Sequence, residues 1–225
     1  MSSTSSEFRR VVITGIGAIT DLGVDAPSTW DAMVGGKSGI TEISDPAFEA
    51  WPAEAWAVRI AGSIDASWDP TTRLDRREVR RLDRCAVLGI YAGIGAVESS
   101  GIDFSSEDLA GCGAVIGSGV GGIQTIEEGV QILHKKGPDR LSPFTVPRLM
   151  ANAIAGDLSI RFGLEGPSGS HTTACASSGH SIGDGYRMVR SGYADVMLAG
   201  GSEAAISPLC LGAFMTMRAR STRND

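Results

Sequence analysis

The sequence has few residues that could cross-link the chain or bind a metal. Its cysteines and histidines are widely spaced and include no C-x-x-C pair: Cys85, Cys112, Cys175, Cys210, His134, His171 and His180. This spacing argues against a disulfide framework and against a zinc site. We therefore expect no metal and no cofactor, and a cytoplasmic location, where thiols stay reduced.

Long hydrophobic runs and an excess of basic residues are also lacking. No apolar run approaches the length that crosses a bilayer, and the polar start "MSSTSSEFRR" does not resemble a secretory signal. A net charge of −6 argues against a dedicated nucleic-acid binder. We expect neither membrane nor nucleic acid as a partner, a disordered tail over residues 1–8 and one folded unit over residues 9–225.

The remaining pattern alternates strands with helices. Apolar, β-branched runs ending in glycine predict strands at 10–20, 57–64, 113–119 and 195–203, with a further strand around 171–174. Helices are expected from a cap at Ser28 or Thr29, over 85–97, from 124, between 147 and 163, and over 177–191. This order predicts an α/β fold whose mixed, mostly parallel sheet has helices on both faces.

One glycine-rich motif allows two interpretations. Gly117, Gly119 and Gly122 match the dinucleotide-binding pattern G-x-G-x-x-G between a predicted strand and helix. The pattern also needs a carboxylate at the end of a second strand about twenty residues on, where this chain reads "HKKGPDR". We favour the other interpretation, that these glycines let backbone segments pass closely.

A single cysteine stands out in "SHTTACASSGH", residues 170–180, between a predicted strand and a predicted helix. At the N-terminus of a helix, unpaired N–H groups and the helix dipole favour the nucleophilic thiolate. The same N–H groups can hold an oxyanion after attack on a thioester. Cys175 is thus a candidate nucleophile. The alternative is a buried, inert cysteine, which is the interpretation that suits Cys85, Cys112 and Cys210.

Motifs along nearly the whole chain resemble those of one enzyme family. They are "RRVVITGIGAIT", "GKSGI", "GAVIGSGVGG", "SPFTVP", "GPSGSHTTACASSGH", "IGDGYRMVRSGYADVMLAGGSEAAISPL" and "STRND". In this order they are similar to the N-terminal half of the type II β-ketoacyl-acyl carrier protein synthases, which are condensing enzymes with the layered thiolase fold.

The resemblance implies a reaction. Cys175 would take an acyl group from an acyl carrier protein as a thioester, and malonyl-carrier protein would lose carbon dioxide and attack it. The product is a 3-oxoacyl chain two carbons longer, made in fatty acid elongation by covalent, ping-pong catalysis. The backbone N–H of Cys175 would supply one oxyanion donor. A homodimer is also implied.

Two family motifs do not occur in these 225 residues. The family's catalytic histidines lie in an H-G-T motif and near an N-x-x-G-F-G-G loop, and neither is present. His134, His171 and His180 match no such motif, and we interpret them as solvated or structural. We expect catalysis to need the C-terminal half of the fold. The alternatives are a truncated or split-gene product without catalysis, and a partner subunit of a polyketide-type ketosynthase.

Two departures from the family pattern concern the acyl pocket. Val120 stands where the resemblance places a larger aliphatic residue, and Thr145 replaces an aromatic residue in "SPFFVP". Both changes enlarge the pocket, so we expect tolerance of longer or bulkier acyl chains.

A basic segment indicates the carrier-binding surface. Residues 73–84 hold six arginines against three acids. Acyl carrier proteins are acidic, and complementary charge steers such encounters. The alternative is a solvated helix face with interleaved ion pairs. By resemblance, five arginines dock the carrier, and we call them the arginine patch: Arg77, Arg80, Arg81, Arg140 and Arg218.

Overall fold

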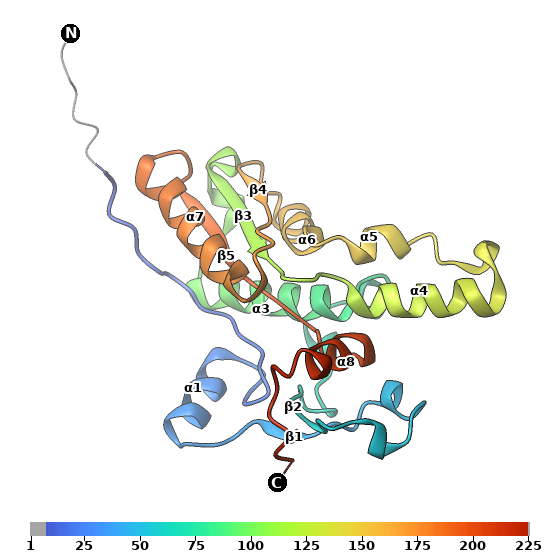
Figure 1. The fold of residues 1–225 in the computed structure, drawn as a ribbon. Coiled ribbons are helices and arrows are strands. Elements are labelled where there is room, and N and C mark those ends of the chain that lie inside the picture. Colours follow the sequence, from blue (N-terminus) through green and yellow to red (C-terminus); the bar gives the residue numbers. More distant parts are fainter. Residues whose placement is uncertain (1–7, 225) are drawn as a thin grey trace.

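A parallel three-stranded sheet organises the structure, a computed structural model that describes residues 8–224. The strands lie in the order β4-β3-β5, with bounds Cys112–Gly117 for β3, Ser168–Gly169 for β4 and Val196–Gly201 for β5 (Figure 1). β3 and β5 pair in register from Cys112↔Val196 to Gly117↔Gly201. Every residue of the central strand β3 is buried, which explains why its sequence is apolar throughout.

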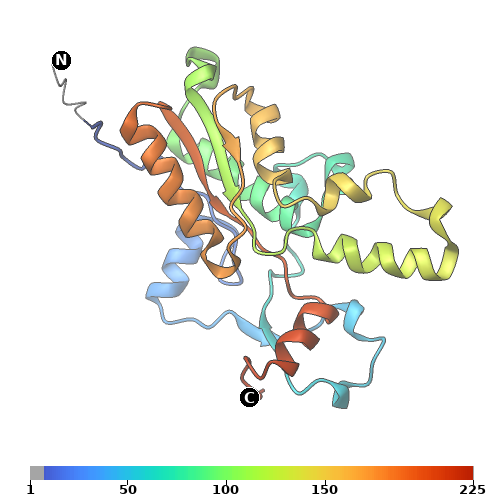
Figure 2. The same ribbon diagram turned by 45° about the horizontal axis from the view of Figure 1, so that its top comes forward.

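Helices cover both faces of this sheet (Figure 2). α7 (Ser177–Ser191) packs on one face, where a Cβ at Gly185 would lie 3.0 Å from the Cβ of Ala199. The alternate residues of β5, Val196 and Leu198, join the core formed with α3 (Arg84–Ser100) and α6 (Ala153–Phe162) on the other face. The predicted α/β class is therefore confirmed.

The remaining elements form the periphery. α1 (Ala26–Val34), α8 (Pro208–Thr216) and an antiparallel pair, β1 (Ile40–Glu42) with β2 (Ile60–Gly62), lie below the sheet in Figure 1. α4 (Ile123–Lys136) and α5 (Thr145–Leu149) project together to one side, and α2 (Arg76–Val79) precedes α3. Short 3-10 turns complete the chain: η1 (Pro46–Phe48), η2 (Ala53–Ala55), η3 (Pro70–Thr72), η4 (Phe104–Ser106), η5 (Leu109–Gly111), η6 (Pro138–Arg140) and η7 (Ala174–Ala176).

The strand predicted for residues 10–20 is wrong. This segment is extended but forms no ladder in the described part of the chain; it lies along α3, where Gly15 and Gly17 approach the helix backbone. Ile13 is 82% exposed. Composition identifies an extended conformation, whereas pairing depends on which element lies alongside.

Other predicted boundaries are corrected. The strand predicted around 171–174 is wrong, because β4 pairs with β3 only at Ser168–Gly169. Beyond it, the chain keeps one bond to the sheet end, from Ser118 N–H to the His171 carbonyl at 3.1 Å. The first helix is capped by Asp25, and Ser28 completes a capping box instead of being the cap itself. The tail predicted for residues 1–8 lies outside the described residues, apart from Phe8.

A membrane span is not found in residues 8–224, since none of their helices is both long and apolar enough to cross a bilayer.

A buried carboxylate joins two helices. Asp83 is 1% exposed and caps α3 by accepting the Cys85 N–H at 3.0 Å. Its other oxygen accepts both the N–H and the hydroxyl of Thr125 in α4, at 2.9 and 2.7 Å. Asp83 therefore fixes the start of α4 against the start of α3.

We expect Asp83→Ala to lower the free energy of unfolding by about 3 kcal/mol, because it removes a helix cap and leaves buried donors unpaired. Urea unfolding measures the loss. Asp31→Ala, at an exposed position of α1, is the control and should change stability by about 0.5 kcal/mol or less. Equal effects of the two substitutions would contradict the role of Asp83.

Candidate active site

Cys175 lies in a tight turn at the carboxyl edge of the sheet, directly before α7. We call residues 173–177 the Cys175 turn. Ala174 has a φ of 52°, a strained value for a residue with a side chain. Buried Ser177 holds this geometry, because its hydroxyl accepts the Thr173 N–H at 2.9 Å and donates to the Ala174 carbonyl at 2.7 Å.

The side chain of Cys175 is exposed, so the interpretation as a buried, inert cysteine is wrong for this residue. Cys85 and Cys112 are buried, and Cys210 is half-buried. Burial raises the pKa of the Cys85 thiol to about 11 and also raises the pKa of Cys112. Cys175 also lies at the start of a long helix whose N-cap makes no side-chain hydrogen bond.

Two histidines bracket the turn. His171 Nε2 lies 3.1 Å from Asp184 Oδ2, and His180 Nδ1 lies 2.8 Å from Thr173 Oγ1. Their ring centroids are 6.2 Å apart. Among residues 8–224, the hydrogen bonds of these rings go to Asp184 and Thr173 and not to the sulfur of Cys175. His134 lies in the last turn of α4.

A glycine loop, residues 118–122, lies against the Cys175 turn. A Cβ at Gly119 would lie 3.3 Å from Ala174 Cα, and one at Gly117 would lie 2.6 Å from the Ser177 carbonyl oxygen. The close passage of backbone that we favoured for these glycines is therefore confirmed. The loop also carries Val120, which is 44% exposed.

Thr145 lies elsewhere. It begins α5 and packs against α4, where a Cβ at Gly129 would lie 3.7 Å from its methyl group. The loop that carries Val120 therefore contacts the Cys175 turn through Gly119, whereas Thr145 contacts α4.

The acids interleaved with the arginines are used inside the fold. Asp75 caps α2, Glu78 completes that capping box and bonds Arg161 at 2.6 Å, and Asp83 is buried. The five residues of the arginine patch are all exposed. The guanidinium of Arg81 lies 5.1 Å from the Phe144 ring, which links the 76–84 segment to the chain beside Arg140.

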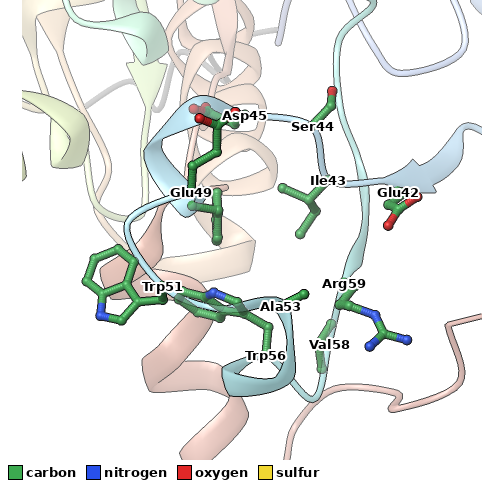
Figure 3. A pocket seen from close by; sticks show the side chains of 11 residues that line it. Glu42, Ile43, Ser44, Asp45, Glu49, Trp51, Ala53, Trp56, Val58 and Arg59 are labelled. Atoms are coloured by element: carbon green, nitrogen blue, oxygen red, sulfur yellow. The ribbon is translucent and has the colours of Figure 1, made fainter.

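A hollow of about 390 Å³ lies between β1 and the turns that follow it (Figure 3). Trp51, Trp56 and Phe48 supply aromatic walls, and Asp45 and Glu49 lie at one end. None of the residues that line it belongs to the Cys175 turn.

Exposure predicts an order of cysteine reactivity. At neutral pH a thiol of pKa about 11 holds about two orders of magnitude less thiolate than an ordinary cysteine. We expect iodoacetamide to modify Cys175 first and to leave Cys85 and Cys112 unmodified until urea is added, as peptide mass mapping will show. Modification of Cys85 before Cys175 in the native protein would contradict this geometry.

Comparison with known proteins identifies the family. Residues 8–225 match the family model described as the N-terminal domain of beta-ketoacyl synthase. The 3-oxoacyl-[acyl-carrier-protein] synthase 2 of Vibrio cholerae is 42% identical over 217 residues, which are 96% of this chain and 51% of that protein.

Solved structures give the same result. A beta-ketoacyl synthase from Burkholderia phymatum is 25% identical with a TM-score of 0.81, covering 96% of this chain and 52% of that one. A ketosynthase in complex with its type II PKS acyl-carrier protein, bound to a hexaketide, is 26% identical with a TM-score of 0.78; the match covers 95% of this chain and 56% of that one. The chain spans about half the length of the curated relatives it matches. It belongs to the β-ketoacyl synthase family and carries the family's N-terminal domain.

Proposed function

We propose that Cys175 is the acyl-accepting nucleophile of a 3-oxoacyl-[acyl-carrier-protein] synthase in fatty acid elongation. The observation that carries this proposal is the exposed sulfur of Cys175 in a strained turn at the start of α7. The relative of the same name that covers 96% of this chain supports the reaction class.

The first half-reaction follows from this geometry. Cys175 gives up its proton to solvent, and its thiolate sulfur attacks the carbonyl carbon of the acyl group on the carrier. The tetrahedral oxyanion forms beside the N-terminus of α7, where the backbone N–H of Cys175 donates to it. When the intermediate collapses, the bond to the carrier sulfur breaks, that sulfur takes up a proton, and the acyl group remains on Cys175.

The second half-reaction needs further groups. Malonyl-carrier protein must lose carbon dioxide so that its carbanion can attack the acyl-Cys175 thioester. The two histidine motifs that the resemblance assigns to this step do not occur in residues 1–225. Acyl loading is therefore the step for which this chain's own residues provide the chemistry, and elongation is proposed for the whole family fold, as a homodimer.

The arginine patch is the proposed docking surface for the carrier. Its five side chains are exposed, and among the described residues none of them forms an ion pair, which supports docking over the alternative of interleaved ion pairs. Opposite charge on an acidic carrier would speed association. The solved ketosynthase in complex with its acyl carrier protein supports this class of partner.

Val120 is the proposed acyl-pocket residue nearest the nucleophile, since its loop contacts the Cys175 turn. Thr145 is proposed to act on the same pocket, although its contacts here are with α4. Both are smaller than the residues that the resemblance places there, which favours longer chains.

A polyketide-type ketosynthase subunit is the second candidate. The solved ketosynthase that is bound to a hexaketide favours this function. The 3-oxoacyl-[acyl-carrier-protein] synthase 2 of Vibrio cholerae is more similar to this chain, at 42% identity, and favours fatty acid elongation. Equal loading of Cys175 from saturated acyl thioesters and from polyketide thioesters would favour the polyketide-type function.

We expect the chain to acquire one acyl group from acyl-carrier protein, detected by intact mass, and Cys175→Ala to abolish this loading. Cys210→Ala is the matched control and should load normally, because Cys210 lies in α8 and not in the Cys175 turn. Loading that persists in Cys175→Ala would overturn the assignment of the nucleophile, and absence of loading in the native chain would overturn the proposed function.

Reversing a charge in the arginine patch should weaken carrier binding. We expect Arg80→Glu to lower the affinity for acyl-carrier protein about tenfold at low salt, and added salt to reduce this difference. Surface plasmon resonance with immobilised carrier measures both effects. Arg187→Glu, an exposed position on α7, is the control; an equal loss in the two variants would contradict a specific patch.

A further inference from the structure

A carboxylate from the end of β5 fills the glycine loop. Glu203 Oε2 accepts the N–H groups of Gly119 at 2.9 Å and Val120 at 3.0 Å, and the hydroxyl of Ser118 lies 3.5 Å away. Successive N–H groups that converge in this way form an anion-binding site. The anion in this protein is one of its own side chains.

Strand pairing explains why these groups meet. β3 and β5 are parallel neighbours that end in register at Gly117↔Gly201. The loop after β3 and the residue two positions after β5 therefore leave the sheet at the same edge. Glu203 reaches the loop across a single strand spacing, and such charge-assisted bonds are stronger than neutral ones.

The glycine loop also lies against the Cys175 turn. Besides the contact of Gly119 with Ala174, the Ser118 N–H donates to the His171 carbonyl at 3.1 Å. Inside the loop, the Gly121 N–H donates to the Ser118 hydroxyl at 3.0 Å. The loop is thus bonded to Glu203 and lies against the Cys175 turn, and Val120 is one of its residues.

We infer that Glu203 is a positioning residue that fixes the glycine loop and thereby sets which acyl chains reach Cys175. This inference rests on the proposed function for its substrate class and goes beyond it by naming the residue that controls specificity. Glu203 touches no reacting atom in this role; it acts through the backbone of Val120. Because Glu203 is exposed, its removal leaves no buried charge without a partner.

The test uses N-ethylmaleimide and N-octylmaleimide, which alkylate a thiol without any acyl transfer. Peptide mapping gives the rate of each reagent at Cys175, and the ratio of the two rates measures discrimination by chain size. We expect Glu203→Ala to raise the relative rate of the octyl reagent about tenfold, the scale on which a shaped apolar pocket discriminates a methylene group. Glu203→Gln keeps an oxygen acceptor and should remain close to the native ratio.

Acetate provides a second readout, since it has the atoms that Glu203→Ala lacks beyond Cβ. Adding acetate to this variant should restore the native ratio, and chloride at equal concentration should not. Glu127→Ala is the matched control, because Glu127 also accepts two hydrogen bonds, from the Ser207 hydroxyl and the Leu209 N–H, at the start of α8.

An unchanged ratio in Glu203→Ala, an equal change in Glu127→Ala, or a change that acetate fails to reverse would each overturn the inference. These outcomes are separable from failure of the proposed function, which is read from acyl loading on Cys175 and not from maleimide rates.

Discussion

The in-register parallel pairing of β3 with β5 is the constraint on which the site depends. Because both strands end at the same edge, the glycine loop and Glu203 emerge as neighbours. β4 pairs with β3 on its other side and delivers the chain to the Cys175 turn at that edge too. Three segments far apart in sequence therefore meet at one edge of the sheet. The Glu203 carboxylate bonds the backbone of the glycine loop, and the Ser177 hydroxyl bonds the backbone of the Cys175 turn. The strained Cys175 turn needs this support, since Ala174 keeps its φ of 52° only if the surroundings enforce it.

Carboxylates act as internal connectors in this acidic protein. Asp83 joins α3 to α4, Glu78 joins α2 to α6 through Arg161, and Glu203 joins β5 to the glycine loop. Each of these carboxylates accepts hydrogen bonds from another element of the fold. Arg77, Arg80 and Arg81 are exposed and form no ion pair with another described residue, although the chain has a net charge of −6. Net charge describes the average field of a protein, whereas docking depends on where the charges are left unpaired.

The sequence predicted correctly those helices and strands that are marked by residues within or next to the element itself. α7 begins at Ser177 and ends at Ser191 as expected, and β3 and β5 lie within one residue of their predicted starts. The strand prediction for residues 10–20 was wrong because strand-like composition does not specify a pairing partner. In this structure the segment lies along the helix α3. Glu203 was missed, although a signal existed: a carboxylate two residues after one parallel strand faces the loop after its neighbour. Only the strand order, which no local pattern encodes, shows that these two segments adjoin.

The resemblance of the glycine loop to a dinucleotide site has a physical basis. Its converging N–H groups bind a negative charge, and they do not distinguish a phosphate from a carboxylate. The group that these N–H groups bind decides between a dinucleotide site and a close passage of backbone segments. Here Glu203 takes both N–H groups at hydrogen-bond distance, so a phosphate would have to displace a side chain that the β3–β5 pairing holds in place. The same backbone geometry that would bind a nucleotide in one protein thus binds the Glu203 carboxylate here, in a loop that lies against the Cys175 turn.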